Sequence, residues 1–198
     1  MPGRMVGIVT SEASELSLPR LPARRVRARS ERALIRAAQA GSKTDMEELF
    51  RRHWPPAYRA AYFVVYDRAA AEDIAQEAFL SALRALDSFD RRRPFGPWLH
   101  RIVVNRAIDW ARARALRREV EASADSPAAD RAEGDLGMRD ELDTALASLS
   151  PERRAVVVLR YVLGYTPGEI AELLELPRGT VNSRLRRALD DLSGEVSR

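Results

Sequence analysis

A stripe of hydrogen-bonding side chains lies near the carboxyl end of the sequence. Arg178, Asn182 and Arg186 follow one another at intervals of four residues, so a helix would align them on one face. An arginine side chain can form two hydrogen bonds with guanine, and an asparagine side chain can form two with adenine. A solvated helix face could carry the same residues, so the meaning of the stripe depends on the elements around it.

The residues around the stripe predict the two helices of a helix-turn-helix motif. Thr166 can cap the first helix, Pro167 suits its first position, and Glu169 completes a capping box. Leu176 and Pro177 then turn the chain into the second helix. The predicted inward-facing residues are Ile170, Ala171 and Leu174 on the first helix and Val181, Leu185, Ala188 and Leu192 on the second. A second helix entered in this way lies in the major groove of DNA, so we interpret the stripe as a DNA-reading surface.

A second stretch with unusual chemistry spans residues 91–118. It contains nine arginines against one acidic residue, Asp109, and three aromatic residues, Phe95, Trp98 and Trp110, are interspersed among them. Arginines can follow phosphates while aromatic rings stack on bases or wedge between them, so the stretch suits single-stranded or melting DNA. The alternative is that the two tryptophans are core residues. The spacing of Trp98 with the apolar residues of its helix predicts that it is at least half buried.

Apolar periodicity predicts helices in the first half of the chain as well. A short helix that starts near Ala33 can end at Gly41. Ser42 and Asp45 resemble a capping box at the start of the next helix, with aspartate in place of the usual glutamate or glutamine. No alternation typical of β-strands occurs, so we predict an all-α fold of two small helical domains.

Three further features divide the helices of the first domain. Pro55 and Pro56 must break or kink the second helix, because proline removes a backbone donor and clashes with the preceding turn. Asp67 can cap the third helix. A short loop, residues 89–94, separates that helix from the arginine-rich one.

Charge and composition divide the chain into four predicted segments. Residues 119–141 carry eight acidic residues against two basic ones, although the whole chain has a net charge of +4. Residues 119–137 also have almost no large apolar side chain, which is typical of a linker. The predicted organisation is a flexible basic arm over 1–32, a helical domain over 33–118, an acidic linker over 119–137 and a second helical domain over 138–198.

The composition also excludes several kinds of site. The chain has no cysteine and only two histidines, His53 and His100, which excludes disulfides, thiolate metal sites and histidine-rich metal sites. No nucleophile with a matching base and no phosphate-binding loop is evident, so we expect no enzyme, no catalytic residue, no metal and no cofactor. No apolar run is long enough to cross a bilayer, and no signal-peptide pattern occurs, so we expect a cytoplasmic location.

Four motifs occur in order along the chain: AEDIAQEAFL at 71–80, FGPWLHRIVVNRAID at 95–109, LSPERR at 149–154 and GTVNSRL at 179–185. Together they resemble the motifs of extracytoplasmic-function (ECF) sigma factors, small bacterial subunits that direct RNA polymerase to promoters. The resemblance covers residues 34–192. It rests on the four motifs in register, since any one of them alone would be a weak signal.

The resemblance implies a role for each predicted domain, with residues 33–118 as sigma region 2 and residues 138–198 as sigma region 4. The implied contacts with core polymerase come from Asp73, Gln76, Glu77, Phe79, Leu80 and Leu83. The implied recognition and melting of the −10 promoter element fall to Arg91, Arg92, Arg93, Phe95, Trp98, Arg101 and Asn105. The implied recognition of the −35 element falls to Arg178, Thr180, Asn182, Ser183, Arg186 and Arg187.

The implied function is that of an alternative sigma factor. Such a protein binds core RNA polymerase, reads the −35 and −10 elements and stabilises the melted strand. The implied partners are the clamp and flap regions of the polymerase and promoter DNA, with no membrane insertion. ECF factors are often held by an anti-sigma factor, and whether this chain has one stays open. The loop at 91–93 is more basic than is usual in the family, so the resemblance does not imply which base it captures.

A conventional helix-turn-helix regulator that acts without replacing the sigma subunit is the alternative hypothesis. It would explain the predicted C-terminal domain equally well. It would not explain the combination of arginine and aromatic residues over 91–118 or the helix over 73–83.

Overall fold

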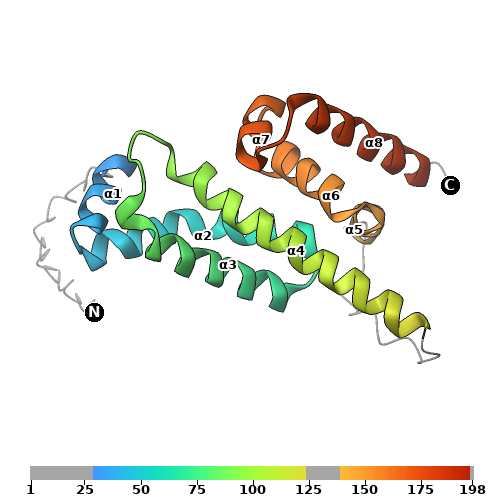
Figure 1. Ribbon diagram of the computed structural model, residues 1–198, viewed down its shortest axis with the longest axis horizontal. Helices are drawn as coiled ribbons and strands as arrows, with labels where there is room; N and C mark the ends of the chain where they lie inside the picture. Colours follow the sequence, from blue (N-terminus) through green and yellow to red (C-terminus); the bar gives the residue numbers. More distant parts are fainter. Residues whose placement is uncertain (1–28, 124–138, 197–198) are drawn as a thin grey trace, which may run out of the picture.

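The computed structural model describes residues 29–123 and 139–196, which form helices and connecting loops without any strand (Figure 1). The first group of helices comprises α1 (Glu31–Gln39), α2 (Lys43–Val65), α3 (Arg68–Arg84) and α4 (Phe95–Ser123), with a 3₁₀ turn, η1 (Leu86–Ser88), before α4. The second group comprises α5 (Arg139–Ser148), α6 (Pro151–Val157), the π-helical turn η2 (Val158–Val162), α7 (Pro167–Leu174) and α8 (Arg178–Val196). The all-α prediction is therefore confirmed. Most of the predicted arm and linker lies outside the described residues.

Side-chain caps and a glycine set several helix ends where the sequence predicts them. The Asp67 carboxylate accepts a hydrogen bond from the Ala70 amide at 3.0 Å, which caps α3. Thr166 and Glu169 form the reciprocal bonds of a capping box at the start of α7. Gly41 follows α1 with a φ of +88°, a left-handed conformation that glycine adopts without strain.

The start of α2 differs from the predicted capping box. Ser42 does cap the helix, since its Oγ accepts a bond from the Asp45 amide at 3.4 Å. The Asp45 carboxylate accepts bonds from the Ser42 hydroxyl at 2.6 Å and from Arg29 at 2.5 Å, whereas the Ser42 amide bonds to the Ala37 carbonyl. The bond from Ser42, and then that from Arg29, lowers the pKa of Asp45.

Two helices extend beyond the predicted domain boundaries. Helix α1 begins at Glu31, before the predicted domain start at residue 33, because Ser30 caps it and accepts a bond from the Ala33 amide. Helix α4 continues to Ser123, past the predicted linker start at residue 119. The sequence turns acidic there, but glutamate and alanine favour helix, so the change of charge does not end the helix.

Of the two predicted effects of Pro55 and Pro56, a break does not occur, because α2 runs as one helix from Lys43 to Val65. The two prolines remove the amides that would bond to the carbonyls of Arg51 and Arg52. Pro55 is exposed and Pro56 half-buried, so water can reach this side of the helix. The buried alanines and valines of the following turns anchor the second half of α2 against its neighbours.

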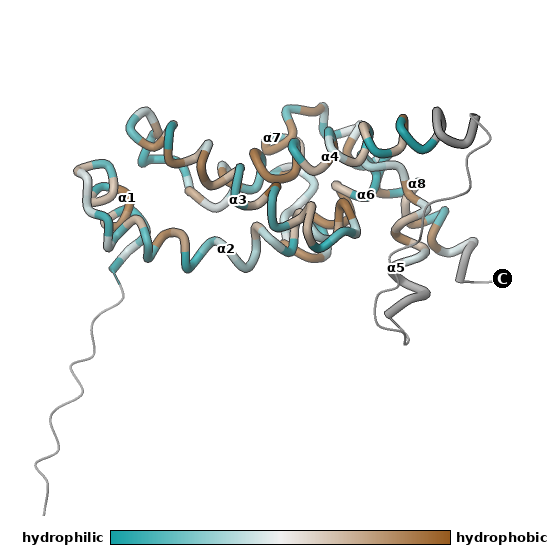
Figure 2. The backbone as a smooth tube through the Cα atoms, turned by 90° about the horizontal axis from the view of Figure 1, so that it is seen from below, coloured by the Kyte–Doolittle hydropathy of each residue, from teal (hydrophilic) through white to brown (hydrophobic). Residues whose placement is uncertain are grey.

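Small residues allow α2, α3 and α4 to pack closely, since interhelical distance depends on the side chains at the contact. The buried alanines of these helices are Ala57, Ala60, Ala61, Ala70, Ala71, Ala75, Ala78, Ala82 and Ala107. Larger residues fill the remaining space, including Leu99, Val103 and Val104, each 0% exposed. Apolar and polar patches alternate along the helices (Figure 2), as expected when each helix buries one face.

The second group of helices packs against the first, with α6 and α7 beside α4 (Figure 1). Arg154 of α6 is 8% exposed. Its guanidinium donates hydrogen bonds to the carbonyls of Leu146, Ala147 and Leu149 within the second group, and to the carbonyl of Val64 at 2.6 Å. Val64 belongs to the last turn of α2, where carbonyls lack partners within the helix. One buried arginine thus ties the end of α5 to the end of α2.

Candidate nucleic-acid interface

The predicted DNA-reading stripe lies on the outer face of α8. Its exposed members are Arg178, Asn182, Arg186 and Arg187, and its half-buried members are Thr180 and Ser183. The opposite face of the helix is buried through Val181 and Ala188, each 0% exposed. Within the described residues, no hydrogen bond or ion pair engages the four exposed side chains. The stripe therefore presents free donors along one helix face.

Helix α7 positions α8 through a tight turn. The turn begins at Glu175, whose φ of +54° is left-handed, and the Leu176 amide closes it by donating to the Ala171 carbonyl at 2.9 Å. Ile170 and Ala171 are buried as predicted, but Leu173 is buried where the sequence predicted Leu174, which is half-buried. The two helices together form the predicted helix-turn-helix motif.

The predicted −10 residues divide into exposed and buried sets. The exposed residues are Arg91, Arg92, Arg93 and Asn105, the half-buried residues are Trp98 and Arg101, and the buried residue is Phe95. The ring of Phe95 is 3% exposed and packs against Phe89 and Trp98, with centroids 5.7 and 5.5 Å away. It has no free face on which a base could stack. In this structure Phe95 therefore occupies a core position beneath the loop, and its predicted contact with DNA stays a prediction.

Part of α4 is covered by the second group of helices. Arg101 pairs with Glu175 at 2.6 Å, and His100 Nδ1 is hydrogen-bonded to the Tyr165 hydroxyl at 2.7 Å. Burial, and to a smaller extent the charge of His53, lowers the pKa of His100 to about 4. Burial also raises the pKa of Tyr165 to about 12. Both side chains are therefore neutral near pH 7, and the guanidinium of Arg101 is already occupied.

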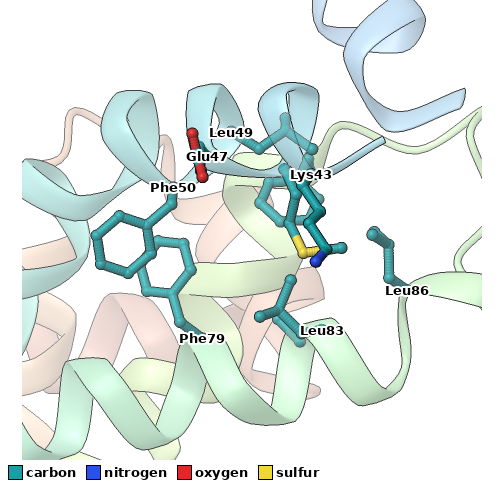
Figure 3. Close-up of a pocket in the computed structure, with 10 residues that line it drawn as sticks. Lys43, Glu47, Leu49, Phe50, Phe79, Leu83 and Leu86 are labelled. Atoms are coloured by element: carbon teal, nitrogen blue, oxygen red, sulfur yellow. The ribbon is translucent and has the colours of Figure 1, made fainter. Parts of the chain in front are cut away.

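A groove of about 440 Å³ lies between α2 and α3 (Figure 3). Its lining residues are Lys43, Met46, Glu47, Leu49, Phe50, Phe79, Ala82, Leu83, Leu86 and Phe95. Phe79 forms its floor at 4% exposed, and the exposed ring of Phe50 lies 4.6 Å from it between centroids. Leu83 is 37% exposed beside them. The family resemblance implies polymerase contacts for Phe79 and Leu83 but for no residue on the α2 side of the groove. An apolar residue on a predicted helix, such as Phe50, carries no local signal that separates a groove lining from a buried face.

The other residues predicted to contact polymerase lie on the outside of α3. Asp73, Gln76, Glu77 and Leu80 are all exposed, and Leu80 is 51% exposed although it is apolar. Asp73 and Glu77 also line a more polar hollow of about 350 Å³ between α3 and α4. Within it, Arg106 of α4 bonds to Glu77 at 2.5 Å. Phe79 is the only buried residue of the predicted set, at 4% exposed.

Trp110 belongs to the same hollow, where it is half-buried. The guanidinium of Arg114 lies 5.0 Å from the centre of its ring, a distance at which a cation is attracted to the face of an indole. The sequence left Trp110 open between a core role and a DNA contact. The described residues give it a structural role at the α3–α4 seam.

Among the described residues, no group of three or more histidine, cysteine, aspartate or glutamate side chains is arranged to hold a metal ion. No described helix combines the length and hydropathy that a membrane span requires.

Comparison with known proteins defines the class of this fold. The family model for Sigma-70 region 2 matches residues 49–117, and the model for Sigma-70 region 4 matches residues 139–192. The chain thus contains the two regions of a sigma-70-type transcription factor. The ECF RNA polymerase sigma factor SigM of Mycobacterium tuberculosis is 35% identical over 160 residues, which is 81% of each chain. The chain belongs to the family of ECF sigma factors, and the prediction from sequence is confirmed.

Other relatives agree. The ECF RNA polymerase sigma factor SigW of Bacillus subtilis is 30% identical and covers 82% of this chain and 94% of its own. Among solved structures, CnrH in complex with the cytosolic domain of CnrY superposes with a TM-score of 0.65 at 29% identity, covering 84% of this chain and 96% of that one. The sigma factor RpoE of Bartonella quintana, solved with the anti-sigma factor NepR, has the same fold, with a TM-score of 0.61 at 24% identity over 77% of this chain and 97% of that one.

Proposed function

We propose that this chain, as an alternative sigma factor, divides promoter recognition between two separate basic surfaces. The carboxyl-terminal helices read the −35 duplex, while α4 and the loop before it recognise and hold the opened −10 strand. The observation that carries the proposal is the presence of two separate arginine-rich surfaces, on α8 and around residues 91–93, in one sigma-factor chain. Region 2 extends over 33–118 and region 4 over 138–198 in this proposal.

Support for −35 recognition comes from the stripe on α8. Asn182 and Arg186 are exposed one turn apart on the second helix of a helix-turn-helix, which is the helix that enters the major groove. We assign base contacts to these side chains and assign Arg187 to the adjacent phosphates. We assign the half-buried residues Thr180 and Ser183 to the sugar–phosphate backbone at the edge of the same groove.

Support for −10 recognition comes from the exposed loop and the polar face of α4. The three loop arginines are exposed and, within the described residues, make no ion pair. Asn105 is exposed on α4 between the buried residues Val104 and Ala107. Arginines that follow phosphates and a loop beside a polar helix face suit a strand whose bases are unstacked. Binding energy for the opened strand would offset the cost of unpairing.

Polymerase docking is assigned to the outer face of α3. Exposed carboxylates and an exposed leucine lie together there. Such a mixture suits a partner surface that is basic and partly apolar. We assign Asp73, Gln76, Glu77, Leu80 and Leu83 to the polymerase clamp, with Phe79 holding the others in place from below. Region 4 is assigned to the flap.

The remaining assignments follow from this role. Recognition of DNA and polymerase requires no covalent step, so we assign the chain no enzymatic activity, no metal and no cofactor. RNA polymerase and promoter DNA are cytoplasmic in bacteria, and we propose the same location for this chain. The matches to both sigma regions do not favour the alternative, a helix-turn-helix regulator that acts without replacing the sigma subunit.

Run-off transcription with purified core polymerase and genomic fragments tests the proposal. We expect specific start sites, each preceded by a shared −35 and −10 sequence, when this chain is added to core. We also expect the isolated chain to bind the same fragments weakly. Absence of initiation at any fragment, together with tight binding by the isolated chain, would instead favour the regulator.

A further inference from the structure

Helix α1 contacts both ends of the loop that precedes α4. At the first end, the side-chain amide of Gln39 donates two hydrogen bonds to backbone carbonyls, at 2.8 Å to Leu86 and at 3.1 Å to Phe89. These carbonyls belong to the 3₁₀ turn η1, which follows α3, and to the first residue of the loop. The Leu86 carbonyl also accepts the 3₁₀ hydrogen bond from the Phe89 amide at 3.0 Å. The glutamine thus adds a second donor at Leu86 and binds the backbone at Phe89, where the loop begins.

At the second end, Glu31 holds the first residue of α4. Its Oε1 accepts a hydrogen bond from the Phe95 amide at 3.0 Å, and its Oε2 is 3.1 Å from His53 Nε2. The His53 ring in turn lies edge-on to the Phe95 ring, with centroids 5.0 Å apart. A Cβ added at Gly96 would lie 3.5 Å from His53 Cε1, so the backbone passes close to this ring. The amide at the start of α4 is thus bonded to a side chain that is itself held from α2.

Between these two anchors, the contacts of Gln39 at one end and of Glu31 at the other, the loop is exposed. Residues 90–94 are all exposed, whereas Phe89 and Phe95 on either side are buried. Within the loop, the Asp90 carboxylate accepts a bond from the Arg92 amide at 2.9 Å, and the Asp90 carbonyl accepts one from the Arg93 amide at 3.0 Å. The loop is therefore a compact turn with fixed ends, and its arginines point into solvent.

The spacing of the two anchors matches the helix that carries them. Glu31 and Gln39 are eight residues apart in α1, so they lie on the same side of the helix and are separated by about 12 Å along its axis. A helix is a rigid spacer, and the ends of the loop are fixed against it at two points. Such support keeps exposed recognition side chains in place before a ligand arrives, which lowers the ordering cost of binding.

We infer that Glu31 and Gln39 are positioning residues for −10 recognition: they fix the two ends of the loop at 89–94 so that its exposed face can hold an unstacked base. The inference rests on the proposed role of this loop in the −10 element. Neither side chain reaches the exposed part of the loop, so both act through the backbone that they bind.

Three substitutions and one control test the inference. Gln39→Met keeps the length of the side chain and its helix propensity but removes both donors. Glu31→Ala removes the acceptor for the Phe95 amide, while Glu31→Gln keeps an oxygen at that position. Ala40→Met is the matched control, because it introduces the same side chain at the exposed neighbouring position.

Each variant is assembled with core polymerase, and its affinity is measured for a −10 single strand and for a −35 duplex, both taken from a promoter that the wild type transcribes. We expect Gln39→Met and Glu31→Ala to bind the −10 strand about tenfold more weakly, as expected when one or two net hydrogen bonds are lost. Discrimination between the preferred base and other bases at the captured position should shrink in parallel. Affinity for the −35 duplex and for core should stay unchanged, and Glu31→Gln and Ala40→Met should resemble the wild type.

The outcomes separate the inference from the proposed function. If the wild-type holoenzyme does not bind the −10 strand, the proposed function fails first. If the wild type binds and discriminates but the variants retain the same base discrimination, only the positioning role is overturned. A uniform loss for all bases and for the −35 duplex would indicate a general folding defect and would also overturn it.

Discussion

At the scale of single residues, two buried polar side chains join the two groups of helices. Arg154 donates to three carbonyls in its own group and to one at the end of α2. His100 is 6% exposed and bonds to Tyr165, while its Nε2 has no hydrogen-bond partner among the described residues. Arginine keeps its charge when buried, but histidine does not. The two contacts therefore respond differently to pH.

His100 makes stability depend on pH. Because burial lowers the pKa of His100 to about 4, the unfolded chain binds a proton near pH 6.5 that the folded chain does not bind until pH 4. Stability should therefore fall as the pH decreases from 7 to 5, by about 1–2 kcal/mol from this residue. Urea unfolding of the wild type and of His100→Gln at both pH values measures it. The variant should lose less stability on acidification, and equal losses would contradict the assignment.

Arg186 allows a residue-level test of −35 recognition. Arg186→Ala should weaken binding of the holoenzyme to the promoter by about 1–3 kcal/mol if a two-bond contact with a base is lost. Arg59→Ala is the control, because it removes the same charge from an exposed position on α2. Competition binding with base substitutions in the −35 element measures both. Equal effects of the two variants would indicate non-specific charge attraction.

At the scale of elements, each helix combines a buried small-residue face with an outer face of distinct chemistry. Helix α3 buries alanines against α2 and α4 while it exposes carboxylates and Leu80. Helix α8 buries Val181 and Ala188 and exposes arginines. Since the outer faces contribute little to the core, folding constrains their residues less, and these residues can be suited to binding partners.

A substitution that introduces one charge can test whether the outer face of α3 binds core polymerase. Leu80→Glu should abolish or strongly weaken binding to core polymerase, because it places a carboxylate in an apolar contact. The fold should stay helical, since Leu80 is 51% exposed. Leu116→Glu is the control, as Leu116 is an exposed leucine on α4. Co-purification with core and circular dichroism measure the two effects, and normal co-purification of Leu80→Glu would refute the docking role.

At the scale of the whole molecule, the packing leaves the two proposed DNA surfaces in different states. The stripe on α8 is exposed, whereas Arg101 of α4 pairs with Glu175 at the end of α7. Arg112 of α4 also pairs with Glu152 of α6 at 2.6 Å. Exposed ion pairs of this kind contribute little stability, so the interface depends mainly on Arg154, on the bond between His100 and Tyr165 and on apolar burial. Use of Arg101 on DNA requires that it leave Glu175.

We therefore expect the two groups of helices to separate when polymerase binds. The chain has no cysteine, so spin labels can be placed uniquely at Arg36→Cys on α1 and Asp190→Cys on α8, both exposed positions. The distance between the labels should lengthen when core polymerase is added. Labels at Arg36→Cys and Arg59→Cys, both in the first group, should keep their distance. An unchanged distance for the first pair would mean that the regions stay packed in the complex.

Much of this architecture follows from local sequence. The helices, the caps at Asp67 and Thr166, and the turn before α8 are determined by residues within one or two turns of each other, and such signals act without the rest of the chain. The α8 stripe could be predicted for the same reason, because a helix aligns residues four apart.

Only the tertiary structure decided which side chains remain available. Phe95 and Asn105 both lie on α4, yet Phe95 is buried by Phe89 and Trp98 while Asn105 is exposed. The contacts of Gln39 and Glu31 with the loop join residues 47 to 64 positions apart, and the bond from Arg154 to Val64 joins residues 90 apart. Burial and long-range hydrogen bonds depend on which faces meet in space, and local periodicity carries no information about that meeting.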